Sequence, residues 1–261
     1  EELFVTNLTG EGSTLYVNDG ATSGAAQPGG GAGLLFEDRT AEAGLSAPSR
    51  PWTGFGTAFV DADLDGGLDV LTVNGAVRLA DVAAAEGGAA PEHATRLAQP
   101  SQLFRNLGGG RFAVAPPALA GEVIAERLVA RGLALGDVDG DGDADAVVGL
   151  NDAAPRLWLA EAPAAASWLG VAPCPGIADA PWLARTVAVS TTPAGGVPLS
   201  ALVRRPHRDG SYASALDPRV VVGLGSRGAR AVELRGAGGT LRWNAPPVRS
   251  YLVWCPQGGS R

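Results

Sequence analysis

Two aspartate-rich segments constrain this chain most, because they repeat one nine-residue pattern, D-x-D-x-D-G-x-x-D. The first occupies residues 61–69 and the second residues 137–145. Carboxylates packed this densely repel one another unless a cation lies among them. Oxygen ligands in this number suit Ca²⁺, which accepts six to eight oxygens in a flexible geometry. Two copies in similar surroundings therefore predict two calcium sites.

Each position of the pattern has an expected role in binding the ion. Aspartates at positions 1, 3 and 5 would bind through their side chains, and the glycine at position 6 permits a sharp turn. Position 7 can offer its backbone carbonyl, and position 9 closes the site. The expected ligands are Asp61, Asp63, Asp65, Gly67 and Asp69 in the first loop and Asp137, Asp139, Asp141, Asp143 and Asp145 in the second.

The residues around the loops decide which kind of calcium loop this is. A helix–loop–helix site needs an acidic residue at position 12, where this chain has Thr72 and Val148. A phosphatase-type nucleophile loop wants Thr or Val where this chain has Asp65 and Asp141. Short aliphatic runs, typical of strands, precede and follow both loops. We therefore expect each loop to join two strands of a β-hairpin and to have no catalytic role.

The repetition extends beyond the loops, to a unit of four strands. A second strand pair, at residues 103–106 and 111–113, follows the first loop, and the beginning of such a pair, at residues 157–159, follows the second. Residues 3–7 resemble the strand after a calcium loop, so the chain is expected to begin inside another repeat. Four antiparallel strands per repeat predict β-propeller blades, but closed propellers have about four to eight of them. We expect a fragment of a longer propeller, the alternative being a few stacked blades that do not close.

The pattern changes after residue 166. Seven short strands at regular intervals, without a helical period, predict a small β-sandwich. The Ala/Pro-rich residues 160–166 are the expected hinge. The predicted fold is therefore all-β, with calcium-binding propeller blades in residues 1–163 and a sandwich in residues 164–261. A further insert, around residues 77–98, is rich in alanine and is expected to carry a short helix.

Charge and cysteine content limit the partners and the compartment. The net charge is −7, with acidic residues concentrated before residue 165 and arginines after it. The arginines are scattered along strands and no nucleic-acid-binding motif accompanies them, so no nucleic-acid partner is expected. No apolar run is long enough to span a membrane. Cys174 and Cys255 lie near the first and last strands of the C-terminal half, where either a disulfide or two free thiols is compatible with the sequence.

Several segments together resemble a known family. They are residues 36–45 (FEDRTAEAGL), 54–61 (GFGTAFVD), 99–106 (QPSQLFRN), 130–137 (ARGLALGD), 167–171 (SWLGV), 209–214 (DGSYAS) and 218–225 (PRVVVGLG). The chain resembles FG-GAP/VCBS propeller repeats followed by an ASPIC/UnbV domain, the arrangement of cartilage acidic protein and its bacterial relatives. The resemblance implies a calcium-stabilised scaffold that is secreted, periplasmic or on the cell surface, with its signal peptide upstream of this chain.

The sequence leaves three classes of function to compare. The first is a non-enzymatic extracellular scaffold or binding module with structural calcium and an unidentified protein or carbohydrate ligand. The second is calcium-dependent adhesion to carbohydrate, for which Trp52 is the best exposed aromatic candidate. The third is an enzyme acting on polysaccharide, but the two histidines, His93 and His207, lie in no catalytic motif. The oligomeric state is left open.

Overall fold

The computed structural model describes six stretches of the chain, and the fold is given for these stretches only. They are residues 2–18, 35–79, 97–176, 179–191, 201–237 and 239–256. Most of the alanine-rich insert lies outside the described residues, as does His93. Within them the chain is built mainly from strands, which confirms the expected all-β fold.

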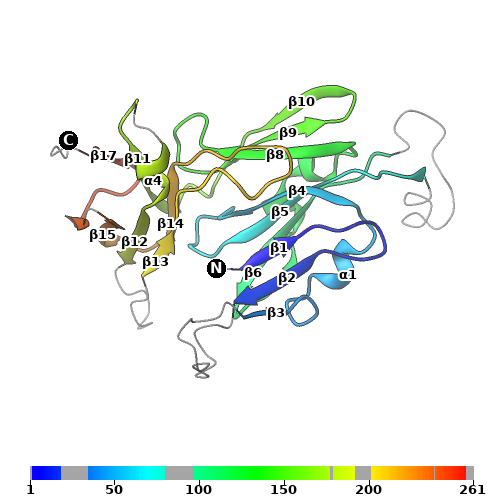
Figure 1. The fold of residues 1–261 in the computed structure, drawn as a ribbon, viewed down its shortest axis with the longest axis horizontal. Helices are drawn as coiled ribbons and strands as arrows, with labels where there is room; N and C mark the ends of the chain where they lie inside the picture. Colours follow the sequence, from blue (N-terminus) through cyan, green and yellow to red (C-terminus); the bar gives the residue numbers. More distant parts are fainter. Residues whose placement is uncertain are drawn as a thin grey trace. The chain divides into compact units, whose positions relative to one another are not determined.

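The strands that precede residue 160 form three sheets (Figure 1). They are β1 (Leu3–Val5), β2 (Thr14–Asn18), β3 (Phe36–Asp38), β4 (Gly54–Val60), β5 (Asp69–Asn74), β6 (Gln102–Gly108), β7 (Arg111–Val114), β8 (Ala130–Gly136), β9 (Asp145–Leu150) and β10 (Ala153–Trp158). Their orders are β1-β2-β3, β4-β5-β6-β7 and β10-β9-β8. Each sheet is a meander of sequence neighbours, as the predicted strand repeat requires.

The four-stranded sheet shows why these residues form strands. Every residue of β5 is buried, and its β-branched side chains fit a strand that is covered on both faces. Val70 of β5 is paired with Phe104 of β6, which is also fully buried. The predicted unit of strand, Asp-rich loop and three further strands is therefore present as one sheet. Within the described residues no sheet closes on itself, so the propeller stays a prediction.

The C-terminal strands form two further sheets. These strands are β11 (Ser167–Pro173), β12 (Thr186–Thr191), β13 (Leu202–Arg204), β14 (Val220–Gly225), β15 (Ala229–Gly236), β16 (Gly239–Asn244) and β17 (Tyr251–Trp254). One sheet has the order β14-β11-β17 and the other β13-β12-β15-β16. Strand β17, the last of the described strands, pairs in parallel with β11, which is the first described strand of this half.

One apolar core joins these two sheets. Leu169 of β11, Val222 of β14 and Trp254 of β17 meet Val187 of β12 and Val232 of β15 in a single buried cluster. Side chains from both sheets thus fill one layer, as in a sandwich. Short helical segments also occur that the sequence did not predict, namely α1 (Ser46–Ser49), α3 (Pro117–Ala120), the 3₁₀ turn η1 (Glu122–Ala125) and α4 (Asp179–Leu183).

A disulfide joins Cys174 and Cys255. The parallel register pairs Pro173 with Trp254, so the residues that follow these two lie side by side. Their Cα atoms are 5.3 Å apart, within the range that a disulfide spans. Of the two alternatives that the sequence left open, the structure has the disulfide.

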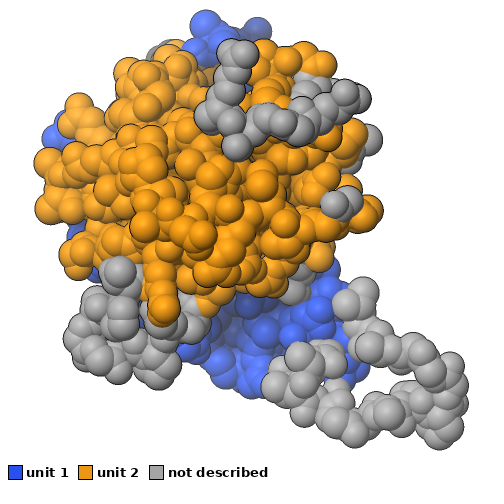
Figure 2. Space-filling model, turned by 90° about the vertical axis from the view of Figure 1, so that its left-hand side faces the viewer, with its two compact units in different colours: residues 1–58, 70–133, 148–155 blue, residues 59–69, 134–147, 156–261 orange. Residues whose placement is uncertain are grey.

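The chain divides into two compact units, shown in different colours in Figure 2. The first contains residues 1–58, 70–133 and 148–155, and the second contains residues 59–69, 134–147 and 156–261. Both Asp-rich loops therefore belong to the same unit as the C-terminal strands. The division into domains after residue 163 stays a prediction. Among the described residues, no helix is long and apolar enough to cross a membrane.

Candidate metal loops

Each Asp-rich loop connects two neighbouring strands of a sheet. The first loop joins β4 to β5, and the second joins β8 to β9. The strand flanks therefore form hairpins, as the sequence predicted. The two loops can be compared position by position because they have the same length and the same pattern.

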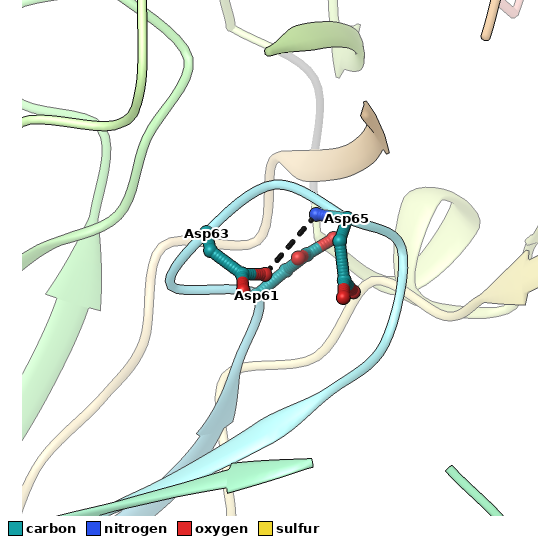
Figure 3. Close-up of side chains that lie close together, drawn as sticks. All are labelled: Asp61, Asp63 and Asp65. Carbon is teal, nitrogen blue, oxygen red and sulfur yellow. Dashed lines mark hydrogen bonds between the residues drawn. The ribbon is translucent and has the colours of Figure 1, made fainter. Parts of the chain in front are cut away.

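The first loop brings three carboxylates together. One oxygen atom from each of Asp61, Asp63 and Asp65 lies within 4.8 Å of the other two. Figure 3 shows these side chains on one turn of the chain, with the backbone N–H of Asp65 donating a hydrogen bond to Asp63. Two oxygens bound to one Ca²⁺ at about 2.3–2.6 Å can be up to roughly 5 Å apart. This group therefore fits a calcium ion.

The second loop brings together a related but different set. Oxygen atoms of Asp137, Asp139 and Asp145 lie within 4.8 Å of one another. Asp137 and Asp145 are buried, whereas Asp139 is exposed, so the group has both a fixed inner side and access to solvent. Among the expected ligands, Gly67, Asp69, Asp141 and Asp143 are not in either three-carboxylate group. Their roles stay predictions.

The same hydrogen bonds shape both loops. The backbone N–H at position 2 donates to the carboxylate at position 9, at 3.1 Å from Ala62 to Asp69 and 2.7 Å from Val138 to Asp145. The N–H at position 6 donates to the carboxylate at position 1, at 3.1 Å in the first loop and 3.0 Å in the second. The N–H at position 5 donates to position 3 at 3.3 Å in both. Carboxylates that accept backbone N–H groups are held in one orientation.

Two residues in each loop have left-handed backbone conformations. Gly66 and Gly142, at position 6, have φ values of 92° and 94°, which explains the glycine there. Position 4 is also left-handed, with φ 84° at Gly140 and 55° at Leu64. Leu64 adopts this unfavourable conformation where its carbonyl accepts a hydrogen bond of 2.7 Å from Gly225. The two loops thus share one backbone path.

Burial gives two carboxyl groups an unusual affinity for protons. Desolvation raises the pKa of Asp61 to about 7, although hydrogen bonds from Gly66 and Gly223 act in the opposite direction. Desolvation likewise raises the pKa of Asp143 to about 6. The Oδ1 atom of Asp143 is buried and has no hydrogen-bond partner within the described part of the chain. A divalent cation would stabilise the ionised form of such groups, so the donor set fits a hard cation.

The first loop packs on the C-terminal strands. The backbone N–H of Gly223, in β14, donates to the Asp61 carboxylate at 3.1 Å. A side chain at residue 223 would overlap Asp61 and the backbone of Leu64, so only glycine permits this approach. Arg204 donates to the carbonyl of Gly66 at 2.8 Å, and Arg227 donates to the carbonyl of Asp65. These contacts join positions 1, 4, 5 and 6 of the loop to the C-terminal half.

The second loop packs on the same half through other residues. The Tyr251 hydroxyl, at the start of β17, donates to the Asp137 carboxylate at 2.6 Å. Arg219 donates to the Asp137 carbonyl and forms an ion pair with Asp217. The ring of Trp168 lies against Gly142 so closely that any side chain there would overlap it.

A pocket of about 160 Å³ is lined by residues of both loops and of the C-terminal strands. Asp61 and Asp143 contribute carboxylates to its wall, and Arg204 and Arg219 contribute guanidinium groups. Leucine and valine side chains, together with Phe59 and Tyr251, supply apolar surface, so the pocket combines charged groups of both signs with apolar area. Concave sites of this mixed character are where small ligands bind.

Among the aromatic and histidine candidates, Trp168 packs against Gly142 of the second loop and His207 lines the pocket. Trp52 is half-buried and Trp243 is partly buried, whereas the other tryptophans are buried. His207 is exposed and lies within 3.0 Å of the carbonyl of Asp209.

The sequence did not predict the residues that hold the loops from the C-terminal half. Arg204, Arg219, Arg227 and Tyr251 belong to no local motif, and their contacts join segments up to 162 residues apart. One signal was available, since a glycine inside a strand often marks close approach of another backbone. Gly223 is such a glycine.

Comparison with known proteins adds no assignment. No family model matches the chain, and a search of curated proteins finds no match either. The donor chemistry of the two loops therefore carries the functional argument.

Proposed function

We propose that this protein is a non-enzymatic, calcium-stabilised binding scaffold that works outside the reducing compartments of the cell. In this proposal the chain is a fragment of an FG-GAP/VCBS-type propeller with an ASPIC/UnbV-like sandwich, as its sequence resemblance implies. Calcium in the loops of residues 61–69 and 137–145 has a structural role. When bound, it supplies the positive charge that balances the clustered carboxylates.

The observation that carries the proposal is the matching geometry of the two loops. Carboxylates converge within 4.8 Å in both, and equivalent backbone N–H groups orient them. An accidental acidic turn would have no reason to share its hydrogen bonds and its left-handed positions with a second turn. The disulfide between Cys174 and Cys255 supports the proposed location outside reducing compartments, because such bonds are typical of oxidising environments.

Calcium should raise the melting temperature of the protein, and removal of metal should lower it. A ligand that binds only the folded state stabilises it by mass action, by about 2.7 kcal/mol at a hundredfold excess over Kd. Differential scanning calorimetry in calcium and in EGTA measures this shift. Isothermal titration with Ca²⁺ and with Mg²⁺ then identifies the metal and counts the sites.

Substitutions in the loops provide the control for this experiment. Asp139→Ala should remove part of the calcium-induced shift, because one loop remains intact. Asp209→Ala, which removes an exposed carboxylate outside the loops, should leave the shift unchanged. Equal melting temperatures for the wild-type protein in calcium and in EGTA would contradict the proposal.

The pocket favours calcium-dependent carbohydrate binding as the second candidate. Its charged and apolar walls lie beside the proposed metal residues Asp61 and Asp143, so occupancy of the loops would change its electrostatic potential. A glycan array probed with and without calcium separates adhesion from scaffolding alone. Glycan binding that disappears in EGTA and in Asp139→Ala supports adhesion. If no glycan binds in a calcium-dependent way, the scaffold role alone is supported.

A further inference from the structure

We propose that the C-terminal strands complete the two metal loops, with the Gly223 N–H and the Tyr251 hydroxyl acting as positioning groups for the first aspartate of each. The inference rests on the proposed function and goes beyond it, because it assigns metal affinity to residues far from either Asp-rich motif. It also predicts that the metal affinity of each loop can be changed without changing that of the other, since each loop depends on a different strand.

In the first loop the positioning group belongs to the backbone of β14. Asp61 accepts hydrogen bonds from Gly66 within its own loop and from Gly223 at 3.1 Å. The side chain of Asp61 is buried, so these donors replace the water that would otherwise surround the carboxylate. Because Gly223 has no side chain, its N–H can reach Asp61. The orientation of this first aspartate is thus set partly from outside the loop.

In the second loop the positioning group is a side chain. The Tyr251 hydroxyl donates to the Oδ2 atom of Asp137 at 2.6 Å. The Tyr251 ring packs edge-on against Trp168, with 5.3 Å between centroids, and lies over Gly170, where a side chain would overlap it. The Arg219 guanidinium lies 5.3 Å from the centroid of the same ring. The ring is therefore fixed on several sides, and its hydroxyl has a defined direction.

The hydrogen bonds on Asp137 leave little freedom for its carboxylate. Its two oxygens accept from Gly140 at 2.6 Å, from Gly142 at 3.0 Å and from Tyr251. A carboxylate has about four acceptor sites, so roughly one remains for a metal ion. Hydrogen-bond partners of this kind orient metal ligands, and their loss typically weakens metal binding about 10–100-fold.

The test measures each loop alone. Asp63→Ala disables the first loop and leaves the second, while Asp139→Ala does the reverse. Tyr251→Phe removes only the hydroxyl, so it should weaken calcium binding about 10–100-fold in the Asp63→Ala background and leave the affinity unchanged in the Asp139→Ala background. Gly223→Ala should weaken calcium binding in the Asp139→Ala background and leave the affinity unchanged in the Asp63→Ala background. Tyr212→Phe, at an exposed tyrosine, serves as the matched control.

A spectroscopic measurement separates positioning from general destabilisation. Luminescence lifetimes of bound Tb³⁺ in H₂O and in D₂O report the number of water molecules on the metal. In the Asp63→Ala background, Tyr251→Phe should raise this number, because a loosened Asp137 is replaced by water. A variant that is merely less stable would keep the number of the parent protein.

The outcomes distinguish the two claims. If the wild-type protein binds no calcium, the proposed function and this inference both fail. If the wild-type protein binds calcium and Tyr251→Phe binds it with unchanged affinity in both backgrounds, the inference fails and the proposed function stands. Loss of affinity in both loops would also overturn the inference, since it would show a global effect.

Discussion

Asp61 combines two properties that conflict in the absence of a cation. Its side chain is buried, and it lies in a group of three carboxylates. Desolvation raises its pKa to about 7, so the metal-free folded protein holds a proton there that the unfolded chain releases at lower pH. A bound divalent ion would reverse the preference by favouring the ionised form.

The stability of the metal-free protein should therefore fall as pH rises from about 4 to about 7. In this window the folded state binds more protons than the unfolded state, and each unit of difference in pKa is worth about 1.4 kcal/mol. Asp61→Asn removes the buried carboxylate that must be ionised in the folded state above about pH 7. The variant should therefore be more stable than the wild-type protein at pH 8 without metal. Its advantage should disappear at pH 5. Urea unfolding in metal-free buffer at both pH values measures the effect.

At pH 8, calcium should make the wild-type protein more stable than Asp61→Asn, because the amide is a weaker ligand than the carboxylate. The exposed substitution Asp209→Asn should leave the pH dependence as in the wild-type protein. A difference between wild type and Asp61→Asn that is the same at pH 5 and pH 8 would refute this account of Asp61.

Two glycines of the second loop allow packing and backbone strain to be compared. Gly140 and Gly142 both have positive φ, but only at Gly142 would a side chain overlap another residue, the ring of Trp168. Gly140→Ala should cost about 1–2 kcal/mol from the left-handed conformation alone. Gly142→Ala should cost about 1–3 kcal/mol more, because it also overpacks the contact with Trp168. Equal losses in urea unfolding would show that Trp168 does not constrain the loop.

At the scale of elements, the strands and hairpins could be predicted because their signals are local. The β-branched residues of β5 and the aspartates that precede them lie within one short stretch of sequence. The packing of the loops could not be predicted in this way. The bond from Gly223 to Asp61 joins residues 162 positions apart, and nothing near either residue encodes the other.

The arginines illustrate the same limit. In the sequence they are scattered along the C-terminal strands and belong to no motif, yet Arg204, Arg219 and Arg227 each donate to a backbone carbonyl of an Asp-rich loop. Carbonyls at these turns have lost regular strand partners and need donors. Which arginine supplies each donor depends on the tertiary structure. The sequence shows an excess of positive charge in one half and of negative charge in the other, but it does not show which arginines contact the loops.

At the scale of the whole molecule, the disulfide closes a long loop of chain. Cys174 and Cys255 are 81 residues apart, and the bond ties the end of β11 to the end of β17. The double variant Cys174→Ser/Cys255→Ser should lose about 2–5 kcal/mol of stability, chiefly because its unfolded chain is less constrained. Thermal unfolding with and without a reductant measures this loss. The variant should not respond to the reductant, and a wild-type protein equally insensitive to it would contradict the prediction.

The bond from Tyr251 to Asp137 also has a consequence for the order in which the protein is made. Its two residues lie 114 positions apart, and Tyr251 belongs to β17, the last strand that the structure describes. During synthesis from the N-terminus, the second loop leaves the ribosome long before its partner does. Until β17 has been made and has paired with β11, Asp137 lacks this donor. The second loop is thus finished by a strand that is synthesised long after it, and a polypeptide released before β17 would carry that loop incomplete.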